Sequence, residues 1–99
     1  MARPSRRAPR EHVVSGKWPA AQLDGAPAAE AAQRLAARLA EAAGDLSLRG
    51  VEGATGVDHD TVARILRGDT WPDIATLANL EHGLEADLWP GRAPPDGEC

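Results

Sequence analysis

Residues 56–68, GVDHDTVARILRG, contain the side chains whose types and spacing could do chemistry in this chain. Asp58 and Asp60 flank His59, and such a group could hold a cation, although capping of a helix is a simpler role for the carboxylates. Arg64 has the planar fork that pairs with O6 and N7 of a guanine, and a carboxylate can accept from N4 of a cytosine. The segment therefore offers side chains that could pair with a base beside carboxylates that would repel phosphates.

No set of residues indicates catalysis. The histidines, His12, His59 and His82, have no metal-ligand spacing to a cysteine, no serine or cysteine nucleophile has a base near it, and no glycine-rich phosphate loop occurs. Cys99 is the only cysteine, so it cannot form an intramolecular disulfide. We therefore expect a protein that is not an enzyme and that uses no cofactor and no metal.

The periodicity after Asp58 predicts a helix with one apolar and one polar face. Asp58 is expected to cap it by accepting hydrogen bonds from the backbone N–H groups of residues 60 and 61, and Gly68 to end it. Asp60 stands four residues before Arg64, the order that favours an ion pair on a helix. The inward residues are Val62, Ile65 and Leu66, the outward residues are Asp60, Arg64 and Arg67, and Ala63 lies at the flank.

A long helix is predicted earlier in the chain, over residues 28–43. Pro27 suits its first position and Gly44 ends it. Its apolar stripe is shallow because alanines surround Leu35 and Leu39.

Two shorter helices complete the predicted domain. Ser47 is expected to cap one of them, and Gly56 to supply the positive φ of the turn that follows it. Pro72 can start the other, and a short fifth helix can follow before Pro90. In the helix after Ser47, the predicted inward residues are Ala54 together with either Leu48 or Val51. In the helix after Pro72, they are Ile74, Leu77, Ala78, Leu80 and Leu84. No strand is predicted.

Composition divides the chain into three parts. Residues 1–27 are basic, contain prolines and glycines and lack periodicity, so they are predicted to be an arm and linker. Residues 28–90 form the domain, and residues 91–99 are a polar, flexible tail. The arm either contacts an anionic partner or is a disordered, solubilising segment. Its cationic residues are Arg3, Arg6, Arg7, Arg10 and Lys17.

The length of 99 residues, 42% of them hydrophobic, suits one compact domain. No stretch approaches the roughly 20 apolar residues of a membrane span, and no apolar run follows the basic N-terminus to form a secretory signal. We therefore expect a cytoplasmic protein without a membrane partner.

Residues 46–84 resemble the helix-turn-helix domain of the Cro and phage-repressor type, the XRE family. The resemblance rests on Val51, the turn "GV" at 56 and 57, "TVARI" at 61–65, Gly68, and "WPDIATLANLEHGL" at 71–84. It implies an all-α, lambda-repressor-like domain of four to five helices, and a transcriptional regulator that binds double-stranded DNA in the major groove.

The same resemblance implies a set of DNA contacts. The positions that face bases are His59, Asp60, Ala63 and Arg64, and those that can meet phosphates are Arg49 and Arg67. Thr61 is either a phosphate ligand or part of the helix cap. Departures from the family pattern are Leu48, where a glutamine is frequent, Glu52, where a small residue is usual, and Leu66, where a glutamate is frequent.

An acidic module that keeps this fold and binds a protein partner is the alternative. Residues 28–90 contain five basic and eleven acidic residues, a balance that opposes phosphate binding unless charge is segregated by face. DNA binding in turn favours a homodimer, because one small domain reads few base pairs. Leu88 and Trp89 are the candidate dimer surface, or they pack on their own core.

Three Trp-Pro pairs, at residues 18, 71 and 89, complete the features of interest. They could form a stacking platform for single strands, but they are far apart in sequence. Each lies at a predicted helix edge, so we interpret the tryptophans as apolar staples of the core.

Overall fold

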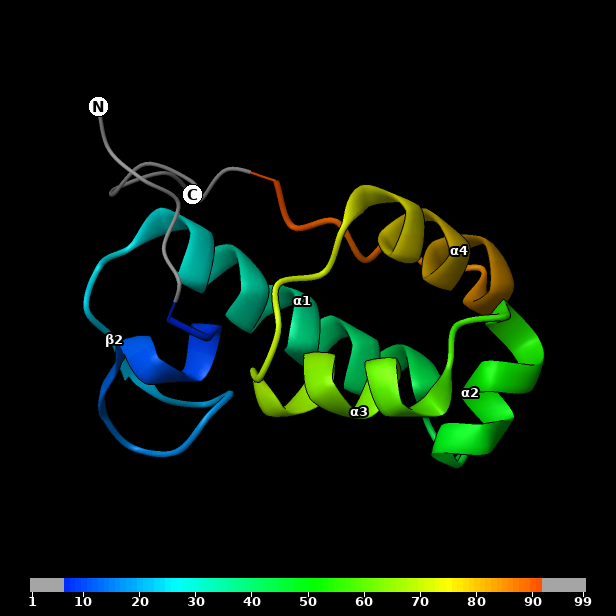
Figure 1. The fold of residues 1–99 in the computed structure, drawn as a ribbon, viewed down its shortest axis with the longest axis horizontal. Helices are drawn as coiled ribbons and strands as arrows, with labels where there is room; N and C mark the ends of the chain where they lie inside the picture. The colour runs from blue at the N-terminus through cyan, green and yellow to red at the C-terminus, as the bar shows by residue number, and fades with distance from the viewer. Residues whose placement is uncertain (1–6, 92–99) are drawn as a thin grey trace.

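A computed structural model describes residues 7–91, which form a mainly helical domain with a small two-stranded sheet (Figure 1). The helices are α1 (Pro27–Ala43), α2 (Leu48–Thr55), α3 (His59–Arg67) and α4 (Ile74–Leu84). A short 3-10 helix, η1 (Pro9–His12), and two strands, β1 (Val13–Ser15) and β2 (Gln22–Leu23), precede them. Arg3, Arg6 and most of the predicted tail lie outside the described residues.

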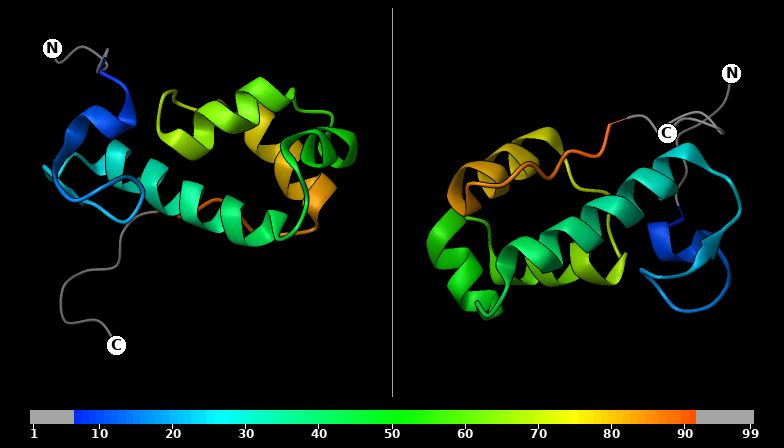
Figure 2. Two further views of the ribbon diagram at one scale, coloured as in Figure 1. Left: turned by 90° about the horizontal axis from the view of Figure 1, so that it is seen from below. Right: turned by 180° about the vertical axis from the view of Figure 1, so that it is seen from behind.

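Helix α1 confirms the predicted long helix. Pro27 occupies its first turn, and Gly44 follows it with a positive φ of 56°. The helix runs along one side of the molecule, with α3 packed against it (Figures 1 and 2). The residues that α1 buries are Ala29, Ala32, Leu35, Ala36 and Leu39.

The pair α2 and α3 is joined by the predicted tight turn. The Ser47 hydroxyl accepts a hydrogen bond from the Gly50 backbone N–H at 3.0 Å, and Gly56 adopts the left-handed conformation with φ 78°. Val51 is buried, as predicted, whereas Leu48 and Ala54 are exposed. The prediction that Ala54 lies inward is therefore wrong.

Helix α4 begins two residues later than predicted. Asp73 caps it by accepting a hydrogen bond from the Thr76 backbone N–H at 2.7 Å. Leu80 is fully buried, but Ile74 is 86% exposed and Ala78 is also exposed, so these two inward predictions are wrong. The cause is helical phase, because Ile74 and Ala78 share a face that lies at least about 120° around the helix from Leu80.

The segment after α4 is extended, and no fifth helix occurs in the described part. Leu88 is buried in the core, while Trp89 is 61% exposed. The Glu81 carboxylate accepts hydrogen bonds from the backbone N–H groups of Leu88 and Trp89 at 2.7 and 2.8 Å. Arg34 and Arg38 of α1 donate to the carbonyls of Gly91 and Trp89, so the segment is tied to two helices.

Residues 7–26 are folded, and the prediction of an arm and linker is wrong for this part. Strands β1 and β2 pair in antiparallel order, and the Trp18 indole N–H donates to the Leu66 carbonyl at 3.1 Å. His12 is buried and its Nδ1 lies 2.9 Å from an Asp24 carboxylate oxygen. The contact of Trp18 joins residues that are 48 positions apart in the sequence, so no local periodicity predicts it.

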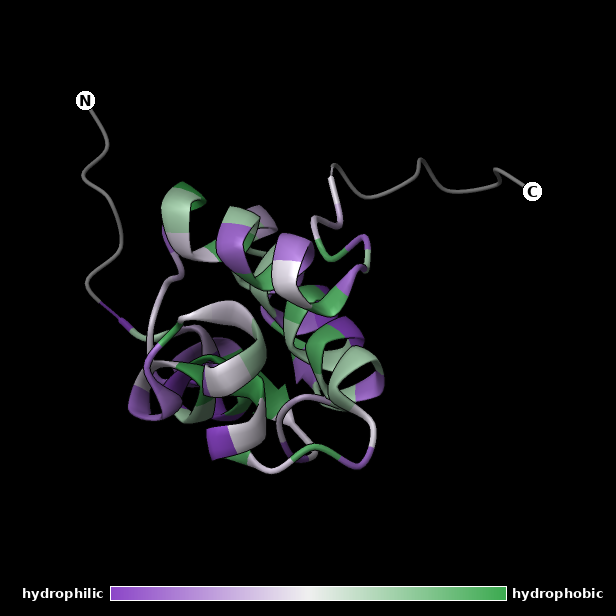
Figure 3. Cartoon of the chain, turned by 90° about the vertical axis from the view of Figure 1, so that its right-hand side faces the viewer, coloured by the Kyte–Doolittle hydropathy of each residue, from purple (hydrophilic) through white to green (hydrophobic). Residues whose placement is uncertain are grey.

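The core lies where the four helices meet, and residues from each of them contribute to it. Figure 3 shows that the helices carry both hydrophobic and hydrophilic stretches, as expected for amphipathic helices around one core. The buried cluster is Leu35, Leu39, Val51, Val57, Val62, Ile65, Leu80 and Leu88.

Gly68 links the core domain to the N-terminal hairpin, which yields a stability prediction. Its φ is 73°, and a Cβ at this position would lie 2.6 Å from the Trp18 ring. Gly68→Ala should therefore cost more than the roughly 1 to 2 kcal/mol of left-handed strain alone. Gly56→Ala is the matched control, because Gly56 has φ 78° and open space around it. Equal losses of unfolding free energy in urea would contradict the contact with Trp18.

Glu81 makes part of the stability dependent on pH. Its hydrogen bonds from the Trp89 and Leu88 backbone N–H groups lower its pKa from the ordinary value of 4.5. Folding therefore gains from this carboxylate above pH 4.5, and the gain is lost as the pH falls through the lowered pKa. Glu81→Gln should flatten the acid side of the profile of melting temperature against pH. Glu41→Gln, an exposed change on α1, should leave the profile unchanged.

Candidate nucleic-acid interface

Helix α3 presents one face to the core and one to solvent. Val62 and Ile65 are buried, and Leu66 is half-buried, which confirms the predicted inward face. Asp60, Arg64 and Arg67 are exposed on the other face, also as predicted. Ala63 is only 8% exposed, so of the predicted base-facing residues it offers the least surface to a ligand.

The first turn of α3 is held by carboxylates from two elements. Asp58 accepts a hydrogen bond from the Asp60 backbone N–H at 3.0 Å, which confirms the predicted cap; the second expected bond, from residue 61, does not form within residues 7–91. Glu52 of α2 accepts from the His59 backbone N–H at 3.2 Å. The same Glu52 oxygen lies 2.8 Å from His59 Nδ1. Glu52 is therefore a second cap that joins α2 to α3.

His59 lies among carboxylates. Besides Glu52, its ring nitrogens lie 3.8 Å from Asp58 and 3.9 Å from Asp60. Donor atoms of Glu52, Asp58 and His59 fall within 4.8 Å of one another, a spacing that could hold a metal ion. Both carboxylates already accept backbone hydrogen bonds of the helix start, so capping accounts for their arrangement.

The predicted ion pair between Asp60 and Arg64 does not form in the described part of the chain. Side chains on a helix lean toward its N-terminus, and the short side chain of Asp60 therefore approaches His59. Arg64 makes no side-chain hydrogen bond or ion pair within residues 7–91, and neither does Arg49. Both guanidinium groups are exposed and available to an external acceptor.

Arg67 and Thr61, the remaining residues predicted to contact DNA, differ in exposure and in hydrogen bonding. Arg67 is exposed, and its Nε donates to the Asp69 carboxylate at 2.9 Å. Thr61 is half-buried and makes no side-chain hydrogen bond within the described residues. The outer face of α3 is thus acidic at its start, near Asp60, and basic over its second half, at Arg64 and Arg67.

The tryptophans have two kinds of environment. Trp18 and Trp71 are half-buried, and their indole N–H groups donate to the carbonyls of Leu66 and Arg7. These two confirm the interpretation as staples. Trp89 is exposed and borders a groove with Ile74 and Leu77 of α4, so the staple interpretation is wrong for it.

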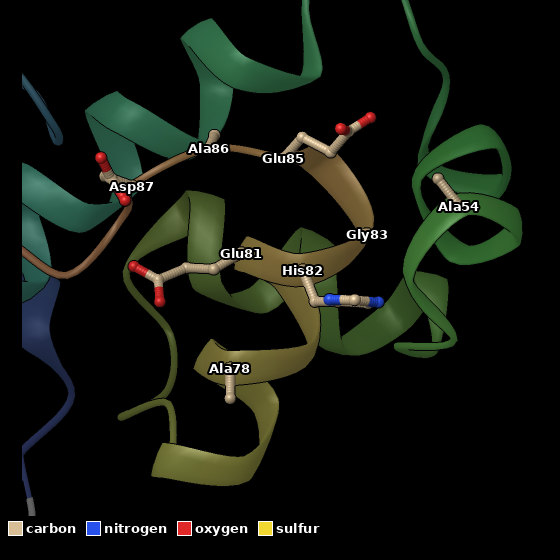
Figure 4. Close-up of a pocket in the computed structure, with 8 residues that line it drawn as sticks. All are labelled: Ala54, Ala78, Glu81, His82, Gly83, Glu85, Ala86 and Asp87. Atoms are coloured by element: carbon tan, nitrogen blue, oxygen red, sulfur yellow. The ribbon is translucent and has the colours of Figure 1, made fainter.

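A separate acidic pocket lies between the ends of α2 and α4. In Figure 4, His82 points toward Ala54, while the carboxylate of Glu81 extends away from it on the other side of α4. The pocket is open and is lined by Ala54, Ala78, Glu81, His82, Gly83, Glu85, Ala86 and Asp87. Its carboxylates give this surface a negative character that contrasts with the second half of α3.

No family model matches the chain, and no curated protein matches it. Among the described residues, no helix combines the length and the apolar character that a membrane crossing requires.

The double role of Glu52 leads to a prediction. Glu52→Ala should lower the unfolding free energy by about 0.5 to 2 kcal/mol, the usual effect of losing a helix cap. The side chain of His59 should also gain freedom, which would appear as new chemical shifts of its ring protons. Glu41→Ala, an exposed change on α1, is the control. Equal stability of the two variants would show that Asp58 alone caps α3.

Proposed function

We propose that this chain is a sequence-specific DNA-binding protein, a transcriptional regulator of the XRE helix-turn-helix type. The observation that carries the proposal is the outer face of α3, where Asp60, Arg64 and Arg67 are exposed and Arg64 has no side-chain partner within residues 7–91. Its inner face is fixed by the core, and the turn at Gly56 sets the angle to α2. A major groove admits such a helix.

In this proposal Arg64 supplies the base contact. Its guanidinium donates two parallel hydrogen bonds to O6 and N7 of a guanine, the commonest specific contact in protein–DNA complexes. Arg49, near the start of α2, and Arg67, at the end of α3, meet phosphates on either side. His59 is constrained by Glu52, so its role is to support the start of α3.

The acidic start of α3 contributes to specificity. Asp60 is exposed and repels any site that offers it no hydrogen-bond donor, while it accepts from N4 of a suitably placed cytosine. Such a carboxylate lowers affinity for all DNA and lowers it most for the wrong sequence. Two copies on half-sites about one helical turn apart would restore affinity, so the proposal includes a homodimer.

The acidic pocket favours a second candidate function. Glu85 and Asp87 are exposed and border an open pocket that suits a basic segment of a protein partner. A protein with this function would keep the helix-turn-helix fold and bind no DNA.

Two substitutions on α3 test the primary proposal. Arg64→Ala should weaken binding to the preferred duplex by about 1 to 3 kcal/mol and relax selection at one base pair. Asp60→Asn should tighten non-specific binding at low salt and blur discrimination, because a negative charge near phosphates is removed. Selection of binding sites from a random duplex library, followed by fluorescence anisotropy, measures both effects.

The control is Arg38→Ala, which removes an arginine from α1 and should leave sequence selection unchanged. Thermal melting shows whether each variant is folded. If the intact chain binds no duplex even at low salt, the primary proposal fails and the acidic pocket becomes the surface to test with basic peptides.

A further inference from the structure

Two arginines that are far apart in sequence meet at one carboxylate. Asp69 accepts hydrogen bonds from Arg10 Nε through one oxygen and from Arg67 Nε through the other, the latter at 2.9 Å. Arg10 belongs to η1, and Arg67 is the last residue of α3. The fold therefore brings the N-terminal segment to the end of the helix that we propose enters DNA (Figure 1).

The backbone around this cluster is fixed. The Arg10 N–H donates to the Gly68 carbonyl at 2.9 Å, and the Asp69 N–H donates to the Arg64 carbonyl at 2.8 Å. The Trp18 ring lies directly against Gly68. The positions of both arginines are thus set before any ligand arrives.

The cluster has unused hydrogen-bond donors. Within residues 7–91 each guanidinium uses its Nε–H, and the Nη groups of Arg10 and Arg67 make no hydrogen bond. Their side chains are 56% and 62% exposed, compared with 27% for Asp69. Hydrogen bonds from the arginines lower the pKa of Asp69, so the carboxylate stays ionised and the cluster carries a net positive charge.

We propose that Arg10 and Arg67, oriented by Asp69, form a phosphate-binding site for the backbone of a DNA duplex. This inference rests on the proposed function and adds to it a contact from the folded N-terminal segment. Arg67 follows Arg64 by three residues on the outer face of α3, so it reaches the groove edge when Arg64 reaches the bases. Paired guanidinium groups supply the fork geometry that phosphate oxygens accept.

Salt dependence of binding tests the site. In Arg10→Gln the slope of log K against log salt should become shallower by about 0.9, the change expected when one phosphate contact is lost. Affinity should fall to the same extent on every duplex sequence. Arg10→Lys keeps the charge and should keep most of the slope. Arg38→Gln removes the same charge from α1 and should match the intact chain.

The outcomes separate this inference from the proposed function. If Arg10→Gln behaves like Arg38→Gln while Arg64→Ala loses selectivity, the site is overturned and DNA binding by α3 stands. If the intact chain binds no duplex, the proposed function fails, and this contact fails with it. Arginine side-chain NMR signals that shift with inorganic phosphate but not with duplex would also overturn the assignment to DNA. Melting curves of both Arg10 variants separate lost contact from lost fold.

Discussion

The burial of Val62 and Ile65 is the constraint on which the rest of the structure depends. Both side chains insert into a core that α1, α2 and α4 also form, so α3 cannot rotate about its axis without exposing them. That fixed rotation is what makes an exposed outer face possible. Arg64, Arg67 and Asp60 are presented to solvent because their neighbours on the same helix are committed to the interior.

Polar contacts at both ends of α3 add to the packing that the core provides. Glu52 ties the start of α3 to α2, and Asp69 ties its end to the N-terminal segment. Both side chains are carboxylates, but they stabilise the two ends of α3 by different interactions. Glu52 satisfies backbone donors that a helix start leaves unpaired, whereas Asp69 offsets and aligns two cations. Two of the acidic residues in this chain, Glu52 and Asp69, therefore have a structural role at the ends of α3.

Local signals predicted most of the helical fold. Ser47, Gly56, Asp58 and Gly68 each specify a helix end through their own backbone or side-chain preference, and each does so in the structure. The hairpin was not predictable in this way, because its stabilising contacts join Trp18 to residues near Gly68. In the candidate site, the exposure of Arg64 followed from periodicity. The environment of His59 did not, because it depends on Glu52 across a turn.

The contact between Trp18 and the end of α3 also orders events during folding. The indole N–H of Trp18 bonds to the carbonyl of Leu66, 48 residues later. Closing so long a loop costs conformational entropy, and the carbonyl that accepts this hydrogen bond is positioned by the end of α3. On a ribosome the N-terminal segment is synthesised first, but its docking place exists only after residue 68 has emerged. Arg10 and Trp18 can therefore make their contacts with Gly68 and Leu66 only after the end of α3 has been synthesised.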